Sequence, residues 1–174
     1  MSDVTLIEDL DVDLATIAEV YRAAFSTTSL PADDQQVRAF RDETLPRHHA
    51  RDGFRFAAAR DHDRLVGFAY GYTGSSGQYW TDWLCSEIPR ELADTWLGGH
   101  FEFCELCVQP ELHRHGIGGR LHDVLLAGLP HATALLTTQR GDTPARRLYE
   151  SRGWQELCEV PDSAFVLFGR ELHA

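Results

Sequence analysis

The stretch from Glu102 to Leu121 reads EFCELCVQPELHRHGIGGRL, and the order of its residues decides the fold. Up to Val108 it is a largely apolar run of strand length, which Pro110 ends. Three glycines then open a segment whose apolar residues recur at helical spacing. A strand that runs through a glycine-rich loop into a helix gathers backbone N–H groups at the positive helix N-terminus. The pattern therefore predicts a pyrophosphate site.

Basic side chains surround this loop in a chain that is otherwise acidic. The 174 residues carry a formal net charge of −11. A local positive field within a negative one is what an anionic ligand requires. The overall negative charge excludes general binding to nucleic acids or anionic membranes, which need a basic surface. The basic residues of the loop are His113, Arg114, His115 and Arg120.

Three other interpretations of the loop remain open. A dinucleotide-binding fingerprint would place a glycine where Leu121 stands. A metal site would rely on His113 and His115, which lie two residues apart in a turn with no third ligand in view. The third interpretation is a helix start with chance glycines and solvated basic residues.

The residues before this stretch predict helices and a β-hairpin. Gly74 to Gly99 breaks the pattern and is expected to be an insertion with a short helix near Pro89 to Leu97. The elements expected before it are a strand at Thr5–Glu8, helices at Leu14–Phe25 (capped by Asp13) and at Pro31–Arg47, with Pro31 in its first turn, and hairpin strands at Phe54–Arg60 and Leu65–Tyr72.

The residues from His100 onward predict a βαβ unit and a closing hairpin. A βαβ unit is normally parallel and right-handed, whereas hairpin strands are antiparallel. We therefore expect an α/β (α+β) fold with a mixed, mostly antiparallel sheet and helices on both faces, in a single domain over residues 1–174. The expected elements are strand His100–Val108, helix Gly116–Leu129, strand Thr133–Thr138, helix Thr143–Arg152 followed by Gly153, and strands Trp154–Glu159 and Ala164–Leu172.

Composition excludes several classes of protein. All 16 residues counted as Lys or Arg are arginine, which excludes enzymes that need a P-loop, Schiff-base or pyridoxal-phosphate lysine. The acidic N-terminus, with Asp3, Glu8, Asp9, Asp11 and Asp13, does not resemble a signal peptide, so we expect a cytoplasmic protein. Cys104 and Cys107 lie three apart in a strand, so they should face opposite sides as core thiols and bind no metal.

Two motifs resemble those of the GNAT acetyltransferases. Leu106–Pro110 followed by His113–Gly118 is similar to the family's fourth strand and coenzyme A loop, written Q/R-x-x-G-x-G/A. Asp142–Trp154 is similar to its second motif, N-x-x-A-x-x-L-Y-x-x-x-G-F. The chain departs from the family pattern at three positions, none of which prevents backbone amides from holding a pyrophosphate. They are His113 for Gln or Arg, Arg114 for Gly, and Asp142 for Asn.

The resemblance implies a GNAT fold, with the sheet splayed at its fourth strand, and an N-acetyltransferase that uses acetyl-CoA and no metal. The pantetheine arm of coenzyme A would pair with the backbone of Leu106–Val108, and the diphosphate would lie on Arg114–Gly119. The cofactor-binding residues are expected to be Leu106, Cys107, Val108, His113, Arg114, His115, Gly116, Ile117, Gly118, Gly119, Arg120, Asp142 and Ala145.

The resemblance also implies two catalytic residues. Tyr149 matches the tyrosine that protonates the departing thiolate, although packing beside Ala145 and Leu148 is an alternative role. Glu102 matches the general base, and burial would raise its pKa toward the useful range. A salt bridge, or an exposed strand end, is the alternative for Glu102. Glu105 is expected to face the other side of the strand.

The expected acceptor is a primary amine of a small molecule, attacked directly in a ternary complex. Tyr79, Trp80 and Trp83 of the insertion would line the acceptor site, although core packing accounts for the two tryptophans equally well. A protein N-terminus or lysine is an alternative acceptor. A non-catalytic acyl-CoA-binding module and a structural protein with an accidental motif also remain open. No nucleic-acid or membrane partner is expected, and a homodimer is compatible with this interpretation.

Overall fold

The computed structural model describes residues 2–7, 10, 12–28 and 30–172. In this part of the chain seven strands form a sheet in the order β1-β2-β3-β4-β5-β7-β6. Neighbouring strands for which a register is given are antiparallel, except for the parallel pair β4 and β5. The expected α/β fold with a mixed, mostly antiparallel sheet is confirmed.

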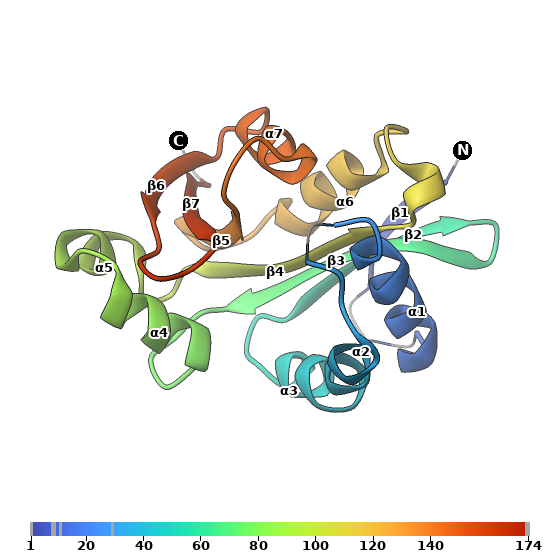
Figure 1. Cartoon of the computed structure of the whole chain (residues 1–174), viewed down its shortest axis with the longest axis horizontal. Helices are drawn as coiled ribbons and strands as arrows, with labels where there is room; N and C mark the ends of the chain where they lie inside the picture. The colour runs from blue at the N-terminus through green and yellow to red at the C-terminus, as the bar shows by residue number, and fades with distance from the viewer. Residues whose placement is uncertain (1, 8–9, 11, 29, 173–174) are drawn as a thin grey trace. The chain divides into compact units, whose positions relative to one another are not determined.

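The chain divides into two compact units. The first unit comprises residues 1–72 and 104–128, and the second comprises residues 73–103 and 129–174. Strand β4 therefore contributes residues to both. Figure 1 labels the helices and strands of each unit. No helix among the described residues is long and apolar enough to span a membrane.

The first unit contains most of the N-terminal elements and the helix that follows the glycine-rich loop. Asp13 caps α1 as predicted, because its carboxylate accepts a hydrogen bond from the Thr16 N–H at 3.0 Å. The elements are β1 (Asp3–Ile7), α1 (Leu14–Phe25), α2 (Asp34–Ala39), a π-helical turn η1 (Phe40–Thr44), α3 (Leu45–His49), β2 (Arg55–Asp61), β3 (Arg64–Thr73), η2 (Pro110–Leu112) and α6 (Ile117–Leu126).

The predicted helix Pro31–Arg47 is wrong in its start and in its continuity. The helix begins at Asp34, where Asp33 and Gln36 form a reciprocal capping box, so Pro31 lies before it. At η1 the Leu45 N–H donates to the Phe40 carbonyl five residues back, and α3 follows. Pro46 has no N–H to continue the regular ladder, which accounts for an irregular turn at this place. Glu8 of the predicted first strand lies outside the described residues.

The two faces of β2 and β3 differ in side-chain size. Phe56, Phe68 and Tyr70 lie on the face covered by α1 to α3, where they belong to the core. The other face carries small residues such as Ala59 and Gly67, and α6 packs on it against β1 and β2. Figure 1 shows α1 to α3 and α6 on opposite sides of these strands. Small side chains let α6 approach the sheet closely.

Gly67 provides the test of this close approach. A Cβ at this position would lie 2.9 Å from the Cys107 carbonyl oxygen and 3.2 Å from Leu121 Cδ1. Because backbone must shift to make room, Gly67→Ala should lower the free energy of unfolding by about 1 to 3 kcal/mol. Urea unfolding measures the loss, with the exposed Ser76→Ala as control, expected within about 0.5 kcal/mol of wild type. Equal stability of both variants would contradict this account of the packing.

The second unit contains the start of β4 and the C-terminal strands. Within it β4 and β5 run parallel, with Glu102 opposite Leu135, and β7 lies antiparallel to both β5 and β6. The expected parallel βαβ connection and closing hairpin are confirmed. The elements are α4 (Tyr79–Glu87), α5 (Arg90–Trp96), β4 (Phe101–Val108, shared), β5 (Thr133–Gln139), α7 (Pro144–Glu150), β6 (Gln155–Glu159) and β7 (Phe165–Glu171).

The segment from Gly74 to Gly99 contains two helices, whereas one was predicted. The prediction missed α4, which starts at Tyr79. Its N-cap residue, Gln78, makes no side-chain cap, so the usual sequence signal of a helix start is missing. Helix α6 ends at Leu126, three residues before the predicted Leu129, and Gly128 has a φ of 67°. Helix α7 ends at Glu150, two residues before the predicted end.

Candidate active site

The glycine-rich loop lies in the first unit and follows β4 through a tight turn. The Gln109 N–H donates to the Val66 carbonyl at 2.9 Å, which keeps the end of β4 beside β3. The chain then makes the short helix η2, and the His113 ring returns to the strand. Its Nε2–H donates to the Val108 carbonyl at 3.0 Å. His113 therefore closes the turn between the strand and the loop.

The start of α6 has the features of an anion site. Gly116 is its N-cap residue, with a φ of 75°, and no side chain caps the helix in the described structure. The Arg120 N–H is the first to donate within the helix, to the Gly116 carbonyl at 3.1 Å. The N–H groups of Ile117, Gly118 and Gly119 have no carbonyl in the preceding turn to donate to. Residues 113–116 are exposed, so the loop that leads to these groups is open to an anion from solvent.

The basic side chains of the loop differ in what they contact. Arg114 is exposed, and its φ of 64° is unusual for a residue with a Cβ. His115 is exposed as well, and its Nδ1–H donates to the His113 carbonyl at 2.9 Å. Arg120 donates to the Ser2 carbonyl at 2.7 Å, so its guanidinium already supports the start of β1. Arg114 and His115 are therefore better placed than Arg120 to meet a phosphate.

The predicted opposite orientation of Cys104 and Cys107 is wrong. Cys107 is buried in the core beneath α1 to α3, and Cys104, which is half-buried, packs against the same core. Strict alternation would have put residues three apart on opposite faces. The alternation is therefore broken between Cys104 and Cys107, as an extra residue in a β-bulge would do.

Glu105 lies in this break and was not among the predicted site residues. Its side chain is half-buried and makes no hydrogen bond or ion pair with the described residues. Burial raises its pKa from 4.5 to about 8. Burial, with a smaller contribution from the charge of Glu105, raises the pKa of Tyr21, Tyr70 and Cys107, so these three groups lie within the electrostatic reach of that carboxylate. This environment could not be predicted from the sequence, because the break in alternation depends on strand pairing.

Glu102 and Tyr149 lie in the second unit. Glu102 is only 5% exposed, and because it pairs with Leu135 it lies on the face of the core below α4 and α5. The adjacent Phe103 points to the other face, where its ring meets Tyr149 edge-on, with centroids 6.0 Å apart. Tyr149 is 7% exposed and also contacts Trp154, at 5.8 Å. Within this unit the two predicted catalytic residues are thus associated with opposite faces of β4.

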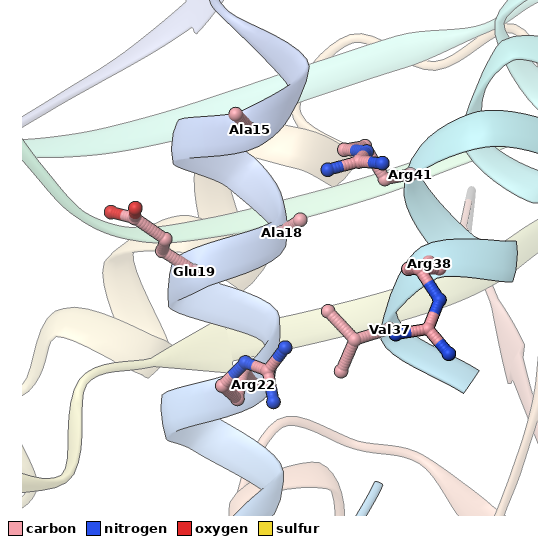
Figure 2. Close-up of a pocket in the computed structure, with 7 residues that line it drawn as sticks. All are labelled: Ala15, Ala18, Glu19, Arg22, Val37, Arg38 and Arg41. Carbon is pink, nitrogen blue, oxygen red and sulfur yellow. The ribbon is translucent and has the colours of Figure 1, made fainter. Parts of the chain in front are cut away.

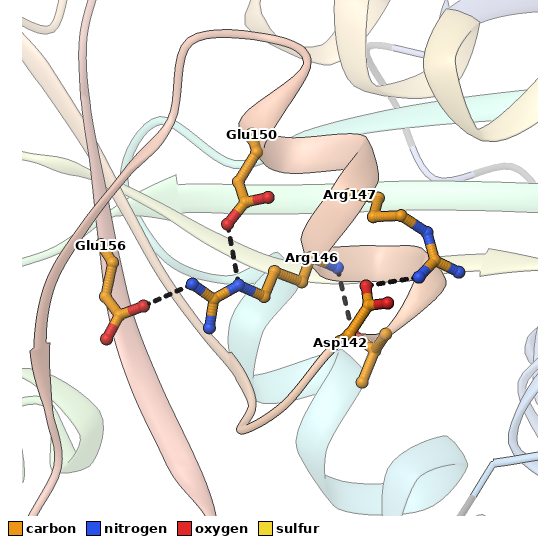
Figure 3. Close-up of polar contacts among 6 residues, drawn as sticks. Asp142, Arg146, Arg147, Glu150 and Glu156 are labelled. Carbon is orange, nitrogen blue, oxygen red and sulfur yellow. Dashed lines mark hydrogen bonds and ion pairs between the residues drawn. The ribbon is translucent and has the colours of Figure 1, made fainter.

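The start of α7 is held by ion pairs. Asp142 pairs with Arg147, and Thr143, rather than Asp142, caps the helix by accepting from the Arg146 N–H at 3.1 Å (Figure 3). The Arg146 guanidinium bridges Glu150 at 2.8 Å and Glu156 at 2.7 Å. Ala145 is exposed. Both Asp142 and Ala145 are therefore at the surface, although the carboxylate of Asp142 already has a cationic partner.

The three aromatic residues expected at the acceptor site have different environments. Tyr79, at the start of α4, is 82% exposed. Trp80 is half-buried, and its indole N–H donates to Thr137 Oγ1 at 3.4 Å. Trp83 is also half-buried, and both tryptophans pack against the core below α4 and α5. Only Tyr79 presents most of its ring to solvent.

A cavity elsewhere in the first unit does not contain the predicted site residues. It measures about 260 Å³ and lies between α1 and the α2–η1 segment (Figure 2). Two of its arginines are already paired, Arg22 with Asp34 and Arg41 with Asp42. The lining residues are Ala15, Ala18, Glu19, Arg22, Val37, Arg38 and Arg41. Among the described residues, no group of three or more His, Cys, Asp or Glu side chains is arranged to hold a metal ion.

Comparison with known proteins decides the family. The model of the acetyltransferase (GNAT) family matches residues 14–154. The chain belongs to the GNAT acetyltransferase family. The expected family and its fold are therefore confirmed. One curated relative of this GNAT protein is the GCN5-like protein acetyltransferase Rv2170 of Mycobacterium tuberculosis (strain ATCC 25618 / H37Rv), 31% identical over 129 residues. The match covers 67% of this chain and 63% of the relative, so the chain matches less than two thirds of that relative's length.

Solved structures share the fold at low sequence identity. The PaiA N-acetyltransferase from Thermoplasma acidophilum, solved in complex with coenzyme A, is 16% identical with a TM-score of 0.68, covering 97% of this chain and 99% of that one. An aminoglycoside 6'-acetyltransferase type Ii is 17% identical with a TM-score of 0.68, covering 99% and 98%. The ribosomal-protein-S18-alanine N-acetyltransferase from Escherichia coli is 15% identical with a TM-score of 0.64, covering 100% and 96%.

The loop of this GNAT protein makes a direct prediction about coenzyme A. At about 100 times its Kd, coenzyme A should raise the Tm of the wild-type protein by roughly 5 to 10 °C, because it binds only the folded state. Gly118→Glu should abolish this shift by placing a carboxylate against the phosphates. Ser76→Glu adds the same charge at an exposed position and should keep the shift. A folded Gly118→Glu variant with the full shift would remove the diphosphate from this loop.

Proposed function

We propose that this GNAT protein transfers the acetyl group of acetyl-CoA to the primary amine of a small molecule, by direct attack in a ternary complex. The observation that carries the proposal is the exposed, uncapped start of α6 behind Gly116. Backbone N–H groups at a helix N-terminus suit a diphosphate without further side chains. A single domain over residues 1–174 and a cytoplasmic location are part of the same proposal.

Each part of the proposed reaction has a group to perform it. Acetyl-CoA supplies an activated acetyl group as a thioester. The loop from Arg114 to Gly119 holds the diphosphate, and the backbone of Leu106 to Val108 pairs with the pantetheine arm. A carboxylate of β4 takes a proton from the acceptor's ammonium group, so that the neutral amine can attack the carbonyl carbon. Tyr149 gives its proton to the sulfur as the carbon–sulfur bond breaks.

A protein N-terminus or lysine is the second candidate acceptor. It is favoured by the relative that is 31% identical, which is named a protein acetyltransferase. The structural neighbours support neither choice, since they include enzymes named for an aminoglycoside and for a ribosomal protein. The net charge of −11 suits a cationic acceptor of either kind.

One experiment tests the function and separates the two acceptors. Release of thiol from acetyl-CoA would be followed across small amines, amino acids, aminoglycosides and short peptides with an unblocked N-terminus or a lysine. The proposal predicts turnover with at least one small amine. Turnover with peptides alone would favour the second candidate. Binding of coenzyme A without thiol release for any acceptor in the panel would support a non-catalytic module instead.

Tyr79 provides a test of the acceptor side of α4. Because its ring is largely exposed, Tyr79→Ala should leave stability unchanged and raise the acceptor KM at least about threefold, the loss of a modest aromatic contact. The KM for acetyl-CoA should stay the same. Trp80→Ala is the contrasting variant, since its ring packs on the core and its loss should lower the Tm. An unchanged acceptor KM in Tyr79→Ala would remove Tyr79 from the site.

Tyr149 provides a test of the chemical step. If it donates a proton to sulfur, Tyr149→Phe should lower kcat by about 10²- to 10⁴-fold, the range of general acid catalysis, with little change in coenzyme A affinity. The phenyl ring keeps the edge-on contacts with Phe103 and Trp154, so folding should be intact. Wild-type kcat in this variant would show that Tyr149 only packs.

A further inference from the structure

We propose that Glu105, not Glu102, is the carboxylate that binds the acceptor's ammonium group and takes its proton. This inference rests on the proposed function and concerns its proton acceptor. It places the base on the carboxylate next to the strand segment that is expected to hold the pantetheine arm. The family pattern, by contrast, assigns the role to Glu102.

Position along β4 favours Glu105. The diphosphate is expected at the start of α6, and the pantetheine arm along Val108 to Leu106, so the thioester should arrive near Leu106. Glu105 is the next residue on the strand. Glu102 is four residues from Leu106, which is about 13 Å at the rise of about 3.3 Å per residue. A base near Glu105 could reach an amine at the thioester without a long relay.

Access also favours Glu105. Its side chain is half-buried and has no hydrogen-bond or ion-pair partner among the described residues, which leaves the carboxylate available to a ligand. Glu102 is 5% exposed and lies over the core below α4 and α5. A charged acceptor meets less protein on its way to Glu105.

Aromatic rings line the surroundings of Glu105 in the first unit. Tyr21 stacks on Phe40, with ring centroids 4.1 Å apart, and Phe40 lies 6.4 Å from Tyr70. The charge of Glu105 contributes, after burial, to the raised pKa values of Tyr21 and Tyr70. Aromatic faces attract cations, and of these rings the half-buried Tyr21 is the one partly open to an ammonium group that pairs with the carboxylate.

None of the charged and titratable groups described around Glu105 competes with it as the proton acceptor. Burial raises the pKa of Glu105 to about 8. Burial also raises the pKa values of Tyr21, Tyr70 and Cys107, which are higher than that of a carboxyl group to begin with, so these groups stay neutral when Glu105 ionises. On α3, His48 shares a hydrogen bond with Tyr70 at 3.1 Å and has its pKa lowered to about 4. Arg51 lies over the Tyr72 ring, at 4.5 Å. No cation among the described residues pairs with Glu105.

The proton balance of the step is simple. The carboxylate of Glu105 takes one proton from R–NH₃⁺, giving the carboxylic acid and R–NH₂. The nitrogen lone pair forms the C–N bond, the C–S bond breaks, and Tyr149 protonates the sulfur. The nitrogen then loses its second proton, which returns to Tyr149 through water and leaves the neutral amide. Glu105 returns its proton to water before the next turnover. A carboxyl group with a pKa near 8 is a stronger base for an ammonium group than one near 4.5.

Three variants test the assignment with the best amine from the thiol-release panel. The wild-type kcat/KM should rise with pH through about 8, because Glu105 must be ionised to act. Glu105→Gln should lose this limb and about 10²- to 10⁴-fold in kcat, while its coenzyme A affinity stays unchanged. Glu105→Asp, which keeps a carboxylate, should recover part of the rate. Glu102→Gln should keep the limb near pH 8, whatever its effect on the rate.

Carboxyl ¹³C NMR of the Glu-labelled protein gives a readout that needs no acceptor. A resonance that titrates near pH 8 should be present in wild type and Glu102→Gln and absent from Glu105→Gln. A Glu105 midpoint near 4.5 would overturn the proposal, as would wild-type turnover with an unchanged limb in Glu105→Gln. In both cases acetyl transfer by the wild type would leave the proposed function standing. Coenzyme A binding without transfer to any amine would instead overturn both.

Discussion

The unsatisfied N–H groups at the start of α6 are the constraint on which the candidate site depends. A helix leaves its first N–H groups without partners, and a capping side chain usually satisfies one of them. Gly116 has no side chain, so in the described structure the cap is missing at the exposed end of the helix. An anion can supply the missing acceptor. The close packing of α6 on the small residues of β2 and β3 keeps this helix end in place.

The residues around the loop also favour binding of an anion at the start of α6. His113 holds the end of β4, and Arg120 holds the start of β1, so both contribute to the position of the loop. Arg114 and His115 stay at the surface, where they can meet phosphate oxygens in a protein whose net charge is −11. Of the departures from the family motif, Arg114 therefore adds a basic group beside the amides and leaves the amides themselves unchanged.

Two glutamates on one strand show how environment assigns chemical roles. Glu102 and Glu105 differ by three residues, yet one is nearly inaccessible and the other is half-buried beside tyrosine rings. A carboxylate acts as a base near neutral pH when burial raises its pKa and a ligand can still reach it. Glu105 meets both conditions. The family motif alone, which points to Glu102, contains no information on either.

Local sequence signals predicted the parts of the fold that depend on local structure. Helix α1 and the turn around Gly116 follow from spacing, caps and glycines, and both were predicted. Pro31 led to a wrong prediction of the helix start, because proline is common in the first turn of a helix. The helix starts instead after the capping box at Asp33. Helix α4 was missed because no side chain caps its start, so the sequence lacks the usual signal. The broken alternation between Cys104 and Cys107 arises from packing between strands, so Glu105 could not be recognised from the sequence.

Amide NMR tests the central claim, that the start of α6 holds the diphosphate of coenzyme A. The ¹⁵N–¹H resonances of Ile117, Gly118 and Gly119 would be followed while coenzyme A, or pantetheine without the diphosphate, is added. We expect these three amides to show large downfield proton shifts with coenzyme A, since new acceptors face them, and little change with pantetheine. Saturation with coenzyme A that leaves all three unshifted would contradict the account.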